Sequence, residues 1–220
     1  MYLRRTKYKD RTYYYLARRV AGTEQEAIYG QESSFGKNRR QRGMSGAAGD
    51  FQLERKTAKR MGLTVSEKND ERFDVDNASA ASAKYLKMQD KAFSKKTTLS
   101  ETLSTSPIEA PVERKKFAIA AFNAGEGRIA KAQKLAKEDG KDPAIWNDVK
   151  EYLETAGATS DKSKEIQEYV DKVLEYDAEF SKKSKADKMV KSGKPRKIRK
   201  LPVGGHWITL DGNHIFIEDK

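Results

Sequence analysis

The segment VERKKFAIAAFNAG, residues 112–125, is the feature that most constrains how this chain can fold. It is strongly apolar and has no proline or glycine before its end, which predicts an α-helix that Gly125 terminates. Helical patterns also occur over residues 23–34, 51–61, 77–93, 145–153 and 166–174. The region from about residue 11 to 180 is therefore predicted to be mainly α-helical.

Other segments indicate turns, strands or exposed excursions. Residues 11–22 are rich in tyrosine and predict a first helix, with a strand as the alternative because tyrosine also favours strands. Glycine and polar residues predict a loop over 36–50, and a Ser/Thr-rich stretch at 95–110 predicts a surface excursion. Asp142-Pro143 predicts the start of a helix, with the aspartate as N-cap and the proline in the first turn.

The hydrophobic period changes near the C-terminus. HWITLDGNHIFI predicts two short strands around Asp211-Gly212, which is a strong signal for a hairpin turn. A two-residue loop would pair Leu210 with Asn213, Ile208 with Ile215, and Trp207 with Phe216. Since an isolated hairpin is marginally stable in water, we expect it to dock on the helical domain or on a partner.

The charge is unevenly placed along the chain. The formal net charge is +12, yet residues 1–20 carry +6 and residues 182–200 carry +9, so the central part is close to neutral. Basic flanks attract polyanions, such as the anionic polymers of a cell wall, an anionic membrane or a nucleic acid. The predicted organisation is a basic N-terminal arm at 1–10, a helical domain at 11–180, a basic linker at 181–200 and a hairpin at 201–220.

Composition excludes several classes of protein. No run of about 18 apolar residues exists to predict a membrane span, and the basic N-terminus lacks the apolar stretch of a signal peptide. We therefore expect a protein that stays where it is made, or that leaves by packaging in a particle or through a membrane lesion. The chain has no cysteine, so neither disulfides nor thiol chemistry is available.

Three separated motifs occur in a set order. They are ESSF at 32–35, GAAGDFQL at 46–53 followed by Thr57-Ala58, and AAFNAGEGRI at 120–129, with Asn77, Tyr85-Leu86 and Tyr169-Val170 in addition. In this order and spacing they resemble the soluble lytic transglycosylase domain, the lysozyme-like family that cuts peptidoglycan (glycoside hydrolase family 23). The resemblance covers about residues 12–175. It implies an α+β, predominantly α-helical, lysozyme-like domain ahead of the basic linker and the C-terminal β-hairpin.

The resemblance also implies a chemistry. The leaving oxygen of a glycosidic bond needs a proton, and a carboxyl group partly buried beside apolar groups keeps its proton near neutral pH. Glu32, with Phe35 near by, is the implied acid. It then acts as a base on the C6 hydroxyl of the muramic acid, which closes a 1,6-anhydro ring. The substrate's N-acetyl group can stabilise the anomeric carbon, so no second carboxylate and no cofactor is required.

The other matched residues are implied to support the acid and to bind the glycan strand of peptidoglycan. Ser33 would orient Glu32, Gln52 would line the sugar groove, and Tyr169 would lie near the acid. The floor under the N-acetyl group would be formed by Phe122, Asn123, Ala124 and Gly125. For the two aromatic residues a place in the core is the alternative, because an aromatic on an apolar helix face is usually buried.

Departures from the family pattern leave alternatives open. Asp50 and Phe51 stand where the family has leucine and methionine, and the family's proline is missing near Arg55. An exposed loop residue is the plain interpretation of Asp50. If its carboxylate lay about 6.5–9.5 Å from Glu32 across the scissile bond, it would activate a water. The enzyme would then be a hydrolase, as in goose-type lysozyme or a related chitinase. A non-catalytic protein that binds the cell wall or a phage particle is the alternative from another class.

Further features concern metals, partners and origin. His206 and His214 flank the predicted hairpin turn, but no third ligand lies at a suitable spacing, so no metal site is predicted. The basic linker has no aromatic residues among its charges, which does not favour a nucleic-acid surface. The GGHWIT and HIFI tail resembles short tails on phage structural proteins. Together with a wall-cleaving domain, it predicts a phage-encoded protein, carried in the virion or released at lysis. The oligomeric state and the choice between endo and exo cleavage are not indicated.

Overall fold

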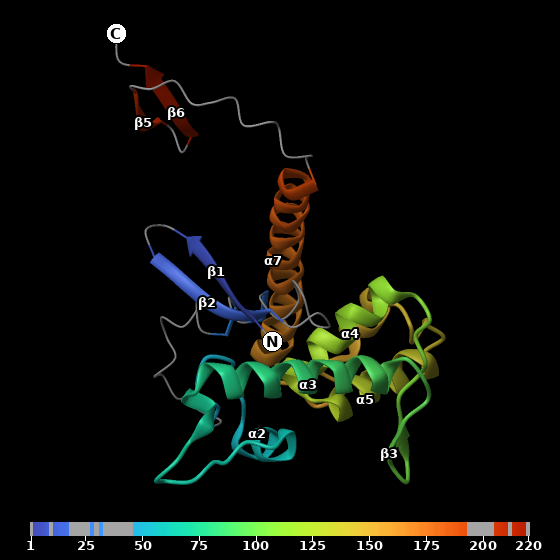
Figure 1. Ribbon diagram of the computed structural model, residues 1–220. Coiled ribbons are helices and arrows are strands. Elements are labelled where there is room, and N and C mark those ends of the chain that lie inside the picture. The colour runs from blue at the N-terminus through green and yellow to red at the C-terminus, as the bar shows by residue number, and fades with distance from the viewer. Residues whose placement is uncertain are drawn as a thin grey trace. The chain divides into compact units, whose positions relative to one another are not determined.

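The computed structural model describes the backbone of residues 2–8, 11–17, 27–28, 31–32, 46–192, 205–210 and 213–218, and the side chains of 27–28, 31–32 and 46–178. The chain divides into two compact units, residues 1–182 and 183–220, and each is described by itself. Helices dominate the described residues, and the strands form small two-stranded antiparallel sheets (Figure 1). The predicted α+β, predominantly helical class is confirmed.

The N-terminal residues form strands rather than the helix that the tyrosines predicted. β1 (Tyr2–Tyr8) and β2 (Arg11–Ala17) pair antiparallel along their whole length. The strand alternative is thus the correct one, because a run of threonine and tyrosine favours extended backbone. The basic arm predicted at 1–10 supplies one strand of this hairpin. Of the helix predicted at 23–34, the described residues 27, 28, 31 and 32 are helical.

Two helices form the centre of the first unit. α3 (Val75–Phe93) and α4 (Pro111–Ala124) pack against each other, and they correspond to the helices predicted at 77–93 and 112–125. The side chain of Asp74 caps α3 by accepting the N–H three residues on, at 2.8 Å. α4 begins with a proline, which is favourable at the first helical position. It ends at Gly125, whose φ of +82° lies in the left-handed region that favours glycine.

The remaining helices surround this pair. They are α2 (Arg55–Met61), η1 (Glu71–Phe73), α5 (Glu126–Glu138), α6 (Trp146–Val149), η2 (Lys150–Tyr152) and α7 (Ser160–Ser192). α2 begins four residues after the predicted start at residue 51, because residues 51–53 complete the turn that the Ala48–Leu53 bridge closes. Only Gly125 separates α4 from α5, so both helix ends meet at the AAFNAGEGRI motif.

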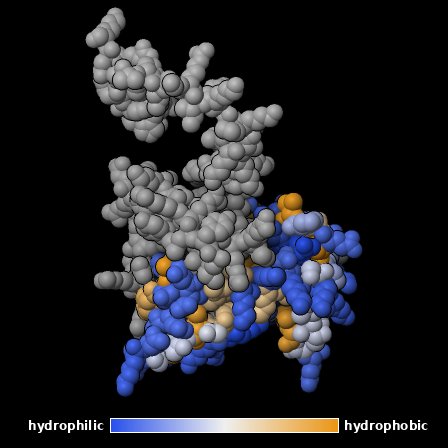
Figure 2. Space-filling model, in the orientation of Figure 1, coloured by the Kyte–Doolittle hydropathy of each residue, from blue (hydrophilic) through white to orange (hydrophobic). Residues whose placement is uncertain are grey.

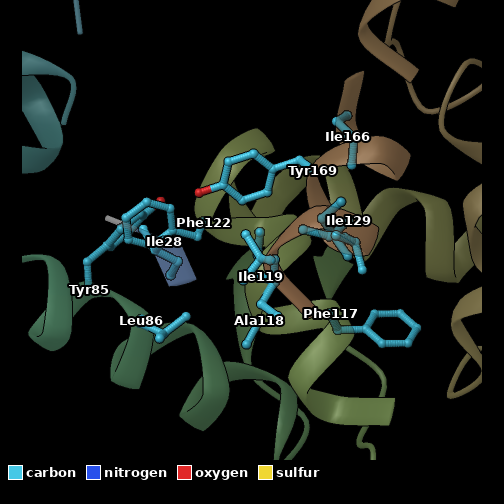
Figure 3. Packing of buried hydrophobic residues seen from close by; sticks show 14 of the residues in the cluster. Ile28, Tyr85, Leu86, Phe117, Ala118, Ile119, Phe122, Ile129, Ile166 and Tyr169 are labelled. Atoms are coloured by element: carbon cyan, nitrogen blue, oxygen red, sulfur yellow. The ribbon is translucent and has the colours of Figure 1, made fainter. Parts of the chain in front are cut away.

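The core joins α3, α4, α5 and α7 through their apolar faces (Figure 3). Phe117 on α4 is fully buried, and its ring centroid lies 5.8 Å from that of Phe93 and 5.4 Å from that of Trp146. Such tilted and edge-on contacts are favourable between aromatic rings. On the face that Figure 2 shows, the described surface is mostly hydrophilic, with smaller apolar areas between the hydrophilic ones. Buried apolar residues of α4 and α7, the two helices that carry several of the predicted site residues, thus belong to one cluster.

The helix predicted to start at Asp142-Pro143 begins later, at Trp146. The carboxylate of Asp142 accepts the N–H of Ala144 at 2.8 Å, which forms a tight turn instead of a cap. Oε2 of Glu113, from the first turn of α4, accepts the N–H of Trp146 at 2.8 Å. An acceptor from another helix thus supplies the cap that the local sequence was expected to supply.

The predicted surface excursion contains a small hairpin of β3 (Thr98–Ser100) and β4 (Leu103–Ser104). Thr105 is 2% exposed and anchors its base. Its hydroxyl donates to the carbonyl oxygens of Ala92 at 2.7 Å and Lys95 at 3.1 Å. A buried threonine therefore fixes where the exposed strands leave the core.

α7 continues well beyond the predicted end of the helical domain. It extends through Ser192, so the first part of the stretch predicted as a linker at 181–200 is helical. The sequence explains the difference, because no glycine or proline occurs in α7, whereas Gly193 and Pro195 follow directly after it.

The second unit contains the predicted C-terminal hairpin. β5 (Gly205–Leu210) and β6 (Asn213–Glu218) are antiparallel, and the pairs Leu210–Asn213, Ile208–Ile215 and Trp207–Phe216 are those that the sequence predicted. The side chains of His206 and His214 lie outside the described ones. Within the described part, no helix is both long and apolar enough to cross a membrane. Among those same residues, no cluster of three histidine or acidic side chains forms a metal site.

Candidate active site

Glu32 and Tyr169 meet at the centre of the candidate site. Glu32 is partly buried in the helical pair 31–32, and Tyr169, 4% exposed, comes from α7. The Tyr169 hydroxyl donates to Oε1 of Glu32 at 2.6 Å. In Figure 3 that hydroxyl points away from α7, toward the side of the core on which Phe122 and Tyr85 lie. The fold thus brings together two residues 137 positions apart in the chain.

The environment of Glu32 favours its protonated form. The pKa of its carboxyl group is raised from 4.5 to about 7, chiefly by burial, since a charged group loses hydration there. Within this net value the negative charge of Glu165 also raises the pKa, whereas the Tyr169 hydrogen bond and the positive charge of Lys162 lower it. Burial and the nearby Glu32 carboxylate also raise the pKa of Tyr169 well above 10, so its hydroxyl remains a donor. Near neutral pH the carboxyl group can therefore both give and take a proton.

A Tyr169→Phe variant should separate burial from hydrogen bonding. The phenol hydrogen bond stabilises the charged carboxylate and lowers the pKa of Glu32, so its loss should raise that pKa above about 7. The pH at which Glu32 gives up its proton should move upward, as followed by carboxyl-selective NMR titration. An unchanged or lower value would show that the hydroxyl does not stabilise the anion. Tyr152→Phe, which removes an exposed phenol elsewhere, is the control.

A second layer of charged residues follows one face of α7. Oε1 of Glu165 accepts from Lys162 Nζ at 2.7 Å and from Asn123 Nδ2 at 3.3 Å. Glu165 lies four residues before Tyr169 and Lys162 lies seven before it, so all three share a helix face. These two charged residues were not predicted from the sequence. Their spacing from Tyr169 is the signal that could have found them.

The end of α4 carries the predicted floor residues. Phe122 is 8% exposed and packs on Tyr85 of α3, with ring centroids 5.2 Å apart, so it belongs to the core cluster as well. Asn123 follows it and is tied to α7 through Glu165. Its Oδ1 is buried and accepts no hydrogen bond among the described residues. Ala124 and Gly125 are half-buried and lead directly into α5.

The loop over residues 46–53 carries Gln52. Its Nε2 donates to the carbonyl oxygen of Gly49 at 2.9 Å, and its φ of +42° is unusual for a residue other than glycine. Asp50 was expected to be exposed, and that expectation is wrong: its exposed fraction is 0%. The loop folds inward at Asp50 and Phe51, because the backbone of Ala48 and Leu53 pairs across it. Ser33 and Phe35 lie outside the described residues.

Comparisons with known proteins agree with this assembly of motifs. Residues 14–145 match the transglycosylase SLT domain family. The membrane-bound lytic murein transglycosylases F of Shewanella woodyi, Desulfosudis oleivorans and Shewanella loihica are 32%, 35% and 33% identical over 152, 109 and 124 residues. These stretches cover 67%, 50% and 56% of this chain. They cover 26%, 20% and 22% of the relatives, so the chain spans about a quarter of their length or less.

The matched region contains Glu32, the loop with Gln52 and the end of α4, whereas Tyr169 lies beyond it on α7. The family match accounts for more than half of the chain. The order of the motifs and the helical fold are consistent with it. This chain belongs to the transglycosylase SLT domain family.

Proposed function

We propose that this chain cleaves the β-1,4 bond between MurNAc and GlcNAc in peptidoglycan as a lytic transglycosylase, with Glu32 as its single general acid and base. The main support for this proposal is the state of Glu32 within an SLT domain. Its carboxyl group is partly buried, has a pKa of about 7 and accepts a hydrogen bond from Tyr169. The relatives are named lytic murein transglycosylases, which gives the substrate class.

In the first step, protonated Glu32 donates its proton to the glycosidic oxygen, and the bond from that oxygen to C1 of MurNAc breaks. A pKa of about 7 leaves a substantial fraction of the carboxyl groups protonated at neutral pH. The GlcNAc side leaves with a hydroxyl group. The substrate's N-acetyl group stabilises the positive charge that develops at C1.

In the second step, the Glu32 carboxylate removes the proton of the C6 hydroxyl of the same MurNAc. The C6 oxygen then attacks C1 and closes the 1,6-anhydro ring. Glu32 ends the cycle protonated, and no water is consumed. Tyr169 supports the carboxylate stage because it donates a hydrogen bond to Oε1 and remains protonated itself.

Gln52, Asn123 and the backbone of Ala124 and Gly125 take the sugar-binding roles in this proposal. Each is partly exposed, and Asn123 is linked to the acid through Glu165, which acts on the pKa of Glu32. Ser33, next to Glu32 in sequence, would orient the acid. The basic residues of 1–20 and 182–200 would hold the enzyme near anionic wall polymers.

Hydrolysis with Asp50 as a second carboxylate has less support. That mechanism needs a carboxylate in contact with a water at the scissile bond. Asp50 is fully buried in its loop. A non-catalytic wall-binding protein is the other alternative, and a gel containing peptidoglycan separates the two cases, since only an enzyme clears a zone in it.

The rate of peptidoglycan cleavage should fall as the pH rises through about 7, because the first step needs protonated Glu32. Glu165→Gln should move this fall to lower pH, because it removes a negative charge that raises the pKa of Glu32. Lys162→Gln should move it to higher pH, because it removes a positive charge that lowers that pKa. The measurement is release of soluble dye from labelled peptidoglycan as a function of pH.

Because the two variants should shift the pH midpoint in opposite directions, the experiment tests directly whether Glu32 is the acid. Glu168→Gln and Lys172→Gln are matched controls, because that exposed pair lies on the same helix. Both controls should leave the midpoint unchanged. Shifts of one sign in both test variants, or a rate that rises through pH 7, would contradict the role of Glu32 as the acid.

A further inference from the structure

Arg72 is a fully buried arginine, which is uncommon, because burial of a charge is costly unless the charge is paired and hydrogen-bonded. Asp70 supplies the pairing through two parallel bonds, Nε to Oδ1 at 2.9 Å and Nη2 to Oδ2 at 2.7 Å. The third nitrogen, Nη1, is directed elsewhere, and its two hydrogen bonds link Arg72 to the candidate site.

Nη1 of Arg72 closes the loop that carries Gln52. It donates to the carbonyl oxygen of Gly46 at 2.8 Å and to that of Leu53 at 3.0 Å. Those two carbonyls lie at the first and last residues of the 46–53 motif. One guanidinium group therefore fixes both ends of the loop to the 70–72 segment.

The backbone of Arg72 holds the middle of the same loop. Its carbonyl oxygen lies so close to Gly49 that a Cβ on this glycine would stand 1.8 Å from it. Gly49 in turn accepts both the backbone N–H and the side-chain amide of Gln52, at 3.3 and 2.9 Å. The contacts form a continuous chain from Arg72 through Gly49 to the Gln52 side chain.

The conformation of Gln52 requires such support. A φ of +42° is sparsely populated for a residue with a side chain, and it persists only where the surrounding structure imposes it. The backbone bridge between Ala48 and Leu53 closes the loop around Gln52. Rigid positioning of a binding residue commonly comes from a buried group behind it.

We propose that Arg72 is a positioning residue for sugar binding: by clamping Gly46, Gly49 and Leu53, it sets the loop geometry in which Gln52 meets the glycan strand. This inference rests on the proposed function. Arg72 itself is too deeply buried to contact the substrate. The task suits arginine, because a planar group with five fixed donors can satisfy a carboxylate and two carbonyls together. Lysine offers a single charged nitrogen and cannot.

Arg72→Lys tests the clamp, with Arg114→Lys as a matched control. Arg114 likewise bonds a carboxylate, Asp90, and two backbone carbonyls, but it holds the start of α4 and does not contact the loop. Steady-state rates are measured with a soluble, uncrosslinked glycan fragment of peptidoglycan. Asp70→Asn, with Asp90→Asn as its control, is the milder pair that serves if Arg72→Lys does not fold.

Arg72→Lys or Asp70→Asn should raise KM about tenfold while kcat changes little, because the loss affects ground-state and transition-state binding alike. Partial unfolding would instead lower the apparent kcat and leave KM unchanged, so the ratio separates positioning from mere stability. A KM equal to that of the matched control would contradict the positioning role of Arg72 but would leave the proposed function intact. Absence of turnover by the wild type would overturn the proposed function itself, and the inference with it.

Discussion

Replacement of Glu32 by glutamine is expected to lower peptidoglycan cleavage by about 10³-fold or more, since in the proposed mechanism one group performs both proton transfers. Glutamine keeps the shape of the side chain and an oxygen that can accept from Tyr169. It cannot donate a proton to the glycosidic oxygen or take one from the C6 hydroxyl. The measurement is release of soluble fragments from purified peptidoglycan at about pH 6, where a pKa of about 7 leaves wild-type Glu32 largely protonated.

Loss of activity in Glu32→Gln should not come from loss of the fold. Because the folded-state pKa of Glu32 is raised, its charged form opposes folding as the pH rises through about 7, whereas a neutral amide avoids that cost. The variant should therefore melt no lower than the wild type above pH 7. Glu168→Gln, an exposed change on α7, should keep full activity. Activity within a few-fold of wild type in Glu32→Gln would remove Glu32 from the mechanism.

Gly49→Ala is expected to lower the free energy of unfolding by about 3 kcal/mol or more, from backbone strain and overpacking together. The φ of Gly49 is +81°, and a Cβ there would stand 1.8 Å from the Arg72 carbonyl oxygen. The clash can be relieved only if the backbone at Gly49 or the backbone at Arg72 moves, which would displace the 46–53 loop or the hydrogen bonds that Arg72 makes to it. Urea denaturation measures the loss.

Gly46→Ala provides the matched control for this clash. Gly46 has the same φ of +81°, yet a Cβ there would meet none of the described atoms within 4 Å. Its loss should be about 1 kcal/mol, the cost of left-handed backbone alone. The difference between the two variants isolates the contact with Arg72. Equal losses would show that Gly49 does not press against that carbonyl.

Much of the fold could be predicted because its long elements have strong local signals. α3 and α4 follow from their apolar spacing and from the residues that begin and end them. The C-terminal hairpin follows from Asp-Gly between alternating residues. The late start of α6 could not be predicted, because its cap is Glu113 from another helix. The sequence predicts an earlier end for α7 than the structure has, because a lysine-rich stretch is typical of linkers, although lysine is also a good helix former.

Some residues of the candidate site could likewise be predicted from the sequence, and others could not. Glu32 was predicted because its motif is one of several in a family order, while nothing local marked it. The burial of Asp50 and Arg72 could not be predicted, because charged residues are usually exposed and no local sequence pattern marks either residue as buried. Glu165 and Lys162 share a helix face with Tyr169, but their effect on the pKa of Glu32 depends on tertiary structure, which brings Glu32 next to that face. The phage origin, the partner of the hairpin and the binding of wall polymers stay predictions.

The most direct test of the central claim is mass spectrometry of the fragments that the wild type and Glu32→Gln release from purified peptidoglycan. Ring closure predicts muropeptides one water lighter than hydrolytic fragments, ending in 1,6-anhydro-MurNAc, in the wild type and not in the variant. Fragments with free reducing ends would contradict ring closure and make the protein a hydrolase. No fragments from the wild type would contradict cleavage of this substrate altogether.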